Sequence, residues 1–240
     1  MSKSKLIIIA AAMMMANAAN AQSINLKKVF SKPQNTTTTT APAAAADEFE
    51  VSGVRYKANG TEAIVVAKKY SGDIYIPKTV SKDGKTMTVT KIGDRAFAGC
   101  KKLRSINMND AAIKEIGNGA FSGCMFLECA SLPNTVVKIG DDAFHMTNIG
   151  VIELPASLKT LGKRAFFFSA IRSISLPNGL TAIDSRTFSG CADLKEITLP
   201  ASVTSIAADA FDNSPNLKNI NVAASNKVYT SSTDGKIHKK

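Results

Sequence analysis

Phenylalanine recurs in this chain at a nearly fixed interval, and that interval restricts the possible folds more than any other feature. Six phenylalanines stand 22 to 24 residues apart, each directly preceded by Ala or Thr: Phe97, Phe121, Phe144, Phe166, Phe188 and Phe211. A period of this length is typical of a solenoid, in which each repeat stacks on the next. The chain is therefore expected to offer an extended surface rather than a deep pocket.

Aligned on the phenylalanines, the repeats share the pattern V-x-x-I-G-x-x-A-F-x-x-C-x-x-L-x-x-I-x-L-P. The last two apolar residues are two positions apart, so they point to the same side of an extended strand. Strands from successive repeats can pair only in parallel. The D-x-A-F stretch is too short for a long helix, and we expect a single helical or 3₁₀ turn there.

One repeat cannot fold alone. It buries about six apolar side chains, worth about 1.5 to 3 kcal/mol each, against a backbone ordering cost of about 1 to 2 kcal/mol per residue. Neighbouring repeats must bury each other's faces, and the ends need caps. We expect an N-terminal β cap at 47–88, six repeats at 89–222, and a C-terminal cap or tail at 223–240.

The first 46 residues have the composition of targeting and linking segments. Lys3 and Lys5, an apolar run at 6–15 and small residues at 19–21 indicate a signal peptide at 1–21, cleaved near Ala21. The apolar run is half the length of a membrane span, so we expect no transmembrane segment in the mature chain. Residues 22–46, rich in Thr, Ala and Pro, are expected to form a flexible tether. Localisation would then be secreted, cell-surface or periplasmic.

The net charge of +11 does not indicate a nucleic-acid partner. Between residues 89 and 222 there are 14 basic and 12 acidic residues, so the repeats carry little net charge. The excess lies in the tether and near the C-terminus. A basic stripe along the solenoid is missing from the sequence, and nucleic acid is not expected as a ligand.

Three of the four cysteines, Cys100, Cys124 and Cys191, stand three residues after a phenylalanine. Stacked positions lie about 5 Å apart, so a disulfide between Cys100 and Cys124 is within reach in an oxidising compartment. Other repeats have Ser near this level, which favours small buried thiols. The sequence leaves the pairing open.

Neither a catalytic nor a metal-binding constellation is found. His145 and His238 are the only histidines, and the register places no nucleophile or second ligand beside His145. Asp141 and Asp142 fall at the start of the expected helical turn, where acidic side chains are favourable. We expect no enzymatic activity, no metal and no cofactor.

The outward positions of the L-x-x-I-x-L strands are the candidate binding surface. Small hydroxyl and amide groups dominate them, and such a face can offer many hydrogen bonds to an extended partner. A hydrophilic sheet surface without any ligand is the alternative. The candidate residues are Ser105, Asn107, Ser131, Glu153, Ser173, Ser175, Glu196, Thr198, Asn219 and Asn221.

With Ile92-Gly-Asp-Arg-Ala-Phe97-Ala-Gly-Cys100 and Leu194-Lys-Glu-Ile-Thr-Leu-Pro200 in register, the chain resembles the BspA-like leucine-rich-repeat family of bacterial surface proteins. The resemblance covers residues 49–237. It implies a right-handed leucine-rich-repeat solenoid, export to the surface or periplasm and, in some members, adhesion to host matrix proteins. The motif is structural, so it carries over no binding residue.

Three functions remain open. The first is a non-enzymatic binding or adhesion protein, monomeric, that contacts a host or matrix protein through its repeats. The second is a polysaccharide-binding accessory protein, which an aromatic cluster on one face would favour. The third is a hydrolase whose site the sequence does not reveal, which a deep cleft with converging ionisable groups would favour.

Overall fold

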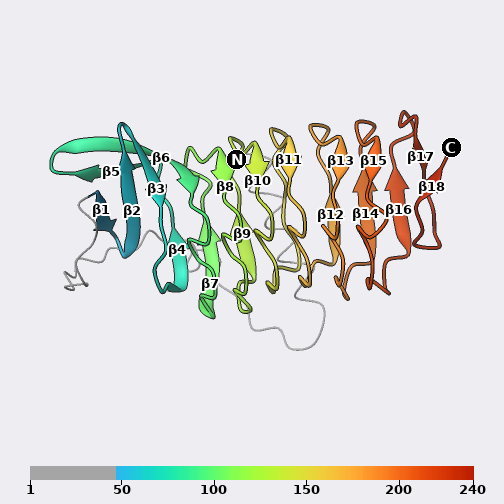
Figure 1. Ribbon diagram of the computed structural model, residues 1–240, viewed down its shortest axis with the longest axis horizontal. Helices are drawn as coiled ribbons and strands as arrows, with labels where there is room; N and C mark the ends of the chain where they lie inside the picture. The colour runs from blue at the N-terminus through green and yellow to red at the C-terminus, as the bar shows by residue number, and fades with distance from the viewer. Residues whose placement is uncertain (1–46) are drawn as a thin grey trace, which may run out of the picture. The chain divides into compact units, whose positions relative to one another are not determined.

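The computed structural model describes residues 47–240, in which the repeats stack as successive turns of a parallel β solenoid (Figure 1). Each full turn contributes to two columns of strands. The first column contains β3 (Glu62–Val65), β6 (Lys85–Ile92), β8 (Glu115–Ile116), β10 (Lys138–Ile139), β11 (Thr160–Leu161), β13 (Ala182–Ile183) and β15 (Ser205–Ile206). The second contains β4 (Ser71–Tyr75), β7 (Lys102–Asn107), β9 (Cys129–Ser131), β12 (Ser173–Ser175), β14 (Glu196–Leu199) and β16 (Asn219–Val222).

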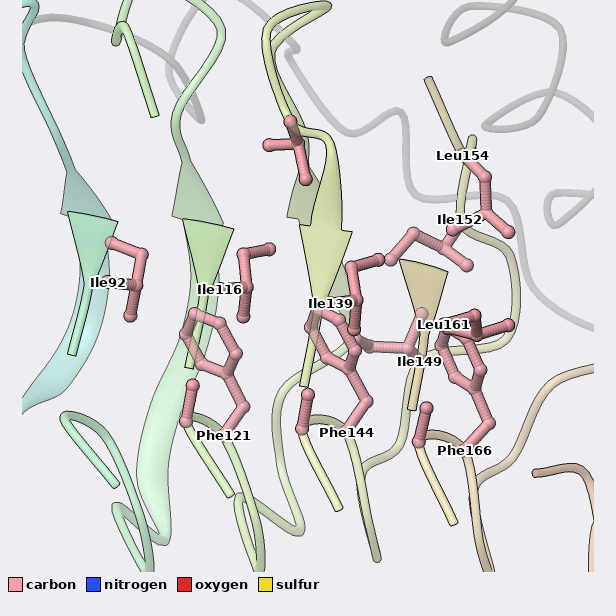
Figure 2. Packing of buried hydrophobic residues seen from close by; sticks show 14 of the residues in the cluster. Ile92, Ile116, Phe121, Ile139, Phe144, Ile149, Ile152, Leu154, Leu161 and Phe166 are labelled. Carbon is pink, nitrogen blue, oxygen red and sulfur yellow. The ribbon is translucent and has the colours of Figure 1, made fainter. Parts of the chain in front are cut away.

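Every strand pair within a column is parallel, which confirms the solenoid predicted from the repeat. The pairing keeps equivalent positions of successive repeats in register, as in Ile174 with Ile197 and Ile197 with Ile220. The apolar positions therefore form continuous rows inside the stack. Figure 2 shows one such row, in which Ile92, Ile116 and Ile139 lie on successive strands.

The phenylalanines form a ladder of parallel rings through the core. Consecutive ring centroids are 5.0 to 5.8 Å apart, and the ring planes differ by 13° or less. Five of the six side chains are fully buried, and Phe211 at the end of the ladder is partly exposed. Offset stacking at this separation adds to the burial of each ring. The ladder explains why phenylalanine is the most regular residue of the repeat.

The ladder extends one turn beyond the repeats that the phenylalanines mark. The ring of Tyr70 contacts that of Phe97, with centroids 4.4 Å apart and the planes tilted by 38°, and β3 and β4 pair in parallel with β6 and β7. Before this turn, β1 (Glu48–Val51), β2 (Val54–Asn59) and β3 form an antiparallel meander, and β5 (Thr79–Lys82) forms a hairpin with β6. An antiparallel meander leaves no parallel edge to extend the solenoid on this side.

The expectation of helical or 3₁₀ turns is wrong for residues 47–240, which contain no helix and hence no helix that could cross a membrane. The chain before each phenylalanine forms tight turns instead. Backbone N–H groups alternate in their partners: Ala96 bonds within its own turn to Gly93, whereas Phe97 bonds to Ala120 in the next repeat at 2.8 Å. Residues such as Arg95 adopt a left-handed backbone, at φ 56°. Both features prevent the consecutive bonds that a helix requires.

The glycine before this turn is needed because successive turns are in close contact. A Cβ on Gly162 would lie 2.5 Å from the backbone nitrogen of Asp141. The next repeat has Asp184 at this position, and there the first column is interrupted between β11 and β13. Within the described residues, Asp184 also lacks the N–H bond to the preceding repeat that Gly162 donates to Ile139 at 2.9 Å. The stack is therefore loosened at Asp184. Ala207 also replaces this glycine, one repeat further on, but its N–H still donates to Ile183 at 2.9 Å and β13 still pairs with β15.

The C-terminal end of the stack is covered by β17 (Tyr229–Thr230) and β18 (His238–Lys239), which pair antiparallel. Asn226, fully buried, ties this segment to the last repeat. Its amide donates to the carbonyls of Pro200 and Val203 at 3.0 and 2.9 Å, and its Oδ1 accepts from the N–H groups of Val228 and Tyr229. All hydrogen-bonding groups of the side chain are thus satisfied, as a buried amide requires.

The predicted signal peptide, at 1–21, and the predicted tether, at 22–46, lie outside the residues that the structure describes.

Candidate functional site

The strand positions predicted to face outward lie in register on the second column. The ladder aligns Ser105 with Cys129, Ser173 with Glu196 and Asn219, and Ser175 with Thr198 and Asn221. Three of the candidates are half-buried: Asn107, Ser131 and Thr198. Six are exposed: Glu153, Ser173, Ser175, Glu196, Asn219 and Asn221. Alternation along a strand explains this placement.

Ser105 differs from the expectation, because it is buried. Its hydroxyl donates to the carboxylate of Asp73 at 2.6 Å, on the neighbouring strand of the Tyr70 turn. Two further pairs on this face bond to each other: Asn221 donates to Glu196 at 2.6 Å, and Ser131 donates to Asn107 at 3.1 Å. Part of the hydrogen-bonding capacity of the strand face is therefore used within the protein.

The strand face is also divided. Strands β4, β7 and β9 form one sheet, and β12, β14 and β16 form another. Between them, the segment around Glu153 joins no ladder of the described chain. This repeat and the next are the two that are one residue shorter between the phenylalanine and the following isoleucine, Ile149 or Ile171.

The cysteines confirm the interpretation of small buried thiols. All four are unpaired, and only Cys129 is exposed. The thiols of Cys124 and Cys191 donate to the carbonyls of Phe97 and Phe166 in the preceding repeats, at 2.9 and 3.1 Å. Burial raises the pKa of Cys124 to about 12 and that of Cys191 to about 11, so both stay protonated and unreactive.

Serine replaces cysteine in the same role. The hydroxyl of Ser214 donates to the carbonyl of Phe188 at 2.8 Å, as Cys191 donates to the carbonyl of Phe166. The position therefore selects a small side chain with a hydrogen to donate. Sequence reasoning recognised the small size but missed the carbonyl that the side chain bonds.

A second surface, at the turns that follow the phenylalanines, was not anticipated from the sequence. Met125, Met146 and Phe168 are 45, 41 and 54 % exposed, and they line a shallow hollow of about 420 Å³. Its wall is completed by Thr147, Asn148, Ser169, Ala170, Gly190, Ala192 and Asp193. We call the hollow lined by these ten residues the apolar recess. It forms over the two shortened repeats, and the signal that could have revealed it is the run of large apolar residues at turn positions.

A polar hollow of about 460 Å³ lies on the other side of the same turns. It is lined by Arg95, Asn118, Ser122, Asp141, Asp142, His145, Arg164 and Phe167, which we call the polar groove. The rings of Phe167 and Phe168 are in edge contact, with centroids 4.5 Å apart. Because Phe167 lines the groove and Phe168 lines the recess, the two hollows adjoin at this pair.

Charges in the polar groove are arranged around Asp142. Arg164 donates to both of its oxygens, at 2.9 and 2.7 Å, and His145 lies 3.8 Å away. Burial lowers the pKa of His145, and the nearby Asp142 only partly opposes this shift. The imidazole is therefore neutral at pH 7, with Ser122 Oγ 3.3 Å from its Nδ1.

This serine and histidine do not make a hydrolase site. A nucleophile needs its base to be oriented and an oxyanion to be stabilised, and the carboxylate near His145 is engaged by Arg164. No set of three or more His, Cys, Asp or Glu side chains within residues 47–240 is placed to hold a metal ion.

Comparison with known proteins identifies the repeat. The model of the BspA type leucine rich repeat region matches in six copies, over residues 85–172 and 114–233. No curated protein sequence matches the chain.

Solved structures of leucine-rich-repeat proteins are similar. One from Bacteroides ovatus is 26% identical, with a TM-score of 0.62. The match covers 74% of this chain and 54% of the B. ovatus protein. One from T. pallidum is 26% identical, with a TM-score of 0.63, and the match covers 72% of this chain and 81% of the T. pallidum protein. The pneumococcal vaccine antigen PcpA, 23% identical, shares the fold, with a TM-score of 0.59 and coverages of 82% and 55%. This chain thus spans about half of the B. ovatus protein. Because the family model covers more than half of its residues, the chain belongs to the BspA-type leucine-rich-repeat family.

Proposed function

We propose that this chain is a secreted or surface-exposed, non-enzymatic binding or adhesion protein that contacts a host or matrix protein through the surface of its repeats. The observation that carries the proposal is the exposed, register-matched surface, which is repeated from turn to turn and lies over a core that provides only stability. Solenoids commonly bind partners across such surfaces, because the array is long and its outward residues are free to vary.

The export part of the proposal rests on residues 1–21, whose basic head, apolar run and small-residue end suit a cleaved signal peptide. Residues 22–46 would then serve as a spacer between the repeats and whatever retains the protein at the surface. We further propose that the mature protein is a monomer, because both ends of the stack carry antiparallel strands.

The decisive experiment is a binding screen of the purified protein against extracellular-matrix proteins and surface glycans, at low salt and at about 0.15 M salt. The proposal expects saturable binding to at least one protein that persists at the higher salt. If all binding disappears there, the signal came from the basic residues near the two ends of the sequence. Absence of any protein ligand at both salt concentrations would refute the proposal.

A polysaccharide-binding role is the second candidate, and the aromatic residues at the turns favour it. Phe167 and Phe168 are adjacent to hydrogen-bonding groups of the polar groove, a combination that sugar sites use. One face of the Phe168 ring is covered, however, because Gly190 lies directly against it: a Cβ there would be 2.8 Å from the ring. The glycan arm of the screen decides between the two candidates.

A further inference from the structure

Two repeats place large apolar residues where the backbone favours glycine. The second residue after each phenylalanine has a left-handed backbone in all six repeats, and four of them use Gly99, Gly123, Gly190 or Asn213 there. The other two use Met146, at φ 55°, and Phe168, at φ 52°. Such a backbone is unfavourable for residues that carry a Cβ, and least unfavourable for glycine and asparagine.

Folding does not explain these two residues. Both side chains remain about half exposed, so each recovers only part of the free energy of burying an apolar side chain. Phe168 also requires glycine at position 190 in the next repeat, because a Cβ there would collide with the ring of Phe168. An unfavourable backbone that supports an exposed apolar group is a reason to look for a function.

The shape of the surface at these two residues suits the binding of a partner. The apolar recess lies over the two shortened repeats, between Met125 on one side and Ala192 on the other. The hollow is large enough for one apolar side chain of a partner. Methionine side chains adapt their shape readily, and Met, Phe and Arg are enriched in protein interfaces.

The adjoining polar groove indicates the charge of that partner. Of its two carboxylates, Asp142 is paired with Arg164, and Asp141 accepts the backbone N–H of Lys163 on one oxygen at 2.8 Å. By contrast, the guanidinium of Arg95 has no hydrogen-bonding or ionic partner among residues 47–240, and neither has the amide Nδ2 of Asn118. The groove therefore has unused donors, and a carboxylate is the group that complements them.

We propose that the apolar recess and the polar groove form one docking site for a peptide segment of a partner protein, in which a large apolar side chain lies close to an acidic one. The apolar side chain enters the recess beside Phe168, and the carboxylate bonds Arg95 and Asn118 in the groove. This inference rests on the proposed binding function and names the face and the chemistry of the ligand.

The test uses short synthetic peptides in three matched pools, labelled for fluorescence anisotropy and measured with the full chain at about 0.15 M salt. One pool combines Leu or Phe with Asp or Glu, the second replaces the acids with Lys, and the third replaces the apolar residues with Ser. We expect the first pool to bind at least about tenfold more tightly than either of the others, because loss of one anchor typically costs that much.

Phe168→Gly is the critical variant. It should weaken the first pool at least about tenfold, and it should leave the unfolding midpoint unchanged or higher, because glycine relieves the left-handed backbone at this residue. Phe126→Ser is the matched control, since Phe126 is an exposed phenylalanine outside the recess. Arg95→Glu should also weaken binding, and Lys218→Glu, which changes the net charge equally at a distant site, should not.

Three results would overturn the inference: equal binding of the three pools, unchanged binding by Phe168→Gly, or glycans that bind at Phe168 in place of peptides. The proposed function is judged separately. If matrix proteins bind to the wild type and to Phe168→Gly alike, but not to a Glu196→Lys variant of the strand face, the binding function stands and the docking site is wrong. If no protein binds to the wild type, the proposed function itself fails.

Discussion

Replacing Phe144 by alanine tests the ring ladder at its middle. The side chain is fully buried, and its ring stacks between Phe121 at 5.1 Å and Phe166 at 5.4 Å. Emptying a buried aromatic site costs about 3 to 5 kcal/mol. Each ring pair contributes about 0.5 to 1.5 kcal/mol beyond burial, so the loss of two pairs favours the upper part of that range.

Phe211→Ala is the matched control, because Phe211 lies at the end of the same ladder. It is partly exposed and has one ring neighbour, Phe188, at 5.8 Å. Less apolar surface and only one ring contact are lost, so we expect a cost below about 3 kcal/mol.

Urea unfolding followed by far-UV circular dichroism measures both variants, since the chain has no tryptophan. Repeat proteins can lose cooperativity when a central repeat is weakened, so the slope of the transition must be compared as well as its midpoint. A cost below about 1 kcal/mol for Phe144→Ala with an unchanged slope, or an equal cost for Phe211→Ala, would refute the ladder as a source of stability.

Asn226→Ala should destabilise the protein by about 2 to 4 kcal/mol, because four hydrogen bonds of a buried side chain are lost. Asn216→Ala is the control and should cost less than about 1 kcal/mol, because its side chain makes one exposed bond. Equal losses in a urea titration would contradict the capping role of Asn226. A thiol reagent should label only Cys129 in the native protein and all four cysteines after unfolding, and reaction of a second native thiol would count against the buried positions. His145 should titrate below pH 6.5 by NMR, because burial disfavours its charged form. Because its pKa is lowered, His145 binds fewer protons in the folded state than in the unfolded state. The protein should therefore lose stability as the pH falls below about 6.5. A titration midpoint of His145 at or above 6.5 would exclude this pH dependence.

Much of the fold could be predicted, because it depends on periodicity. Apolar residues at equivalent places in successive repeats must be buried against one another, and Ile174, Ile197 and Ile220 are aligned as the repeat requires. Replacement of the glycine before the turn had an outcome that periodicity does not give: the first column is interrupted at Asp184, whereas Ala207 at the same position keeps its bond to the preceding repeat. The turns before the phenylalanines could not be predicted, since their N–H groups alternate between their own turn and the next repeat.

The candidate surfaces were less predictable. Alternation along a strand placed Ser173 and Glu196 on the outward side, but the same rule missed the burial of Ser105, because its cover, Asp73, lies in the turn before the first recognised repeat. The apolar recess was missed for a related reason. A run such as Phe166-Phe167-Phe168 contains one core residue and two surface residues, and only the backbone conformation distinguishes them.

Periodicity was thus sufficient to establish that the chain stacks as a parallel solenoid and where its core lies, because every repeat has apolar residues at the same positions. Which exposed residues form a surface depends on the tertiary structure. Neighbouring turns decide whether an outward position such as Ser105 is covered, and side chains from several successive repeats together line the recess beside Phe168. Such effects arise between repeats, so no single repeat of the sequence contains them.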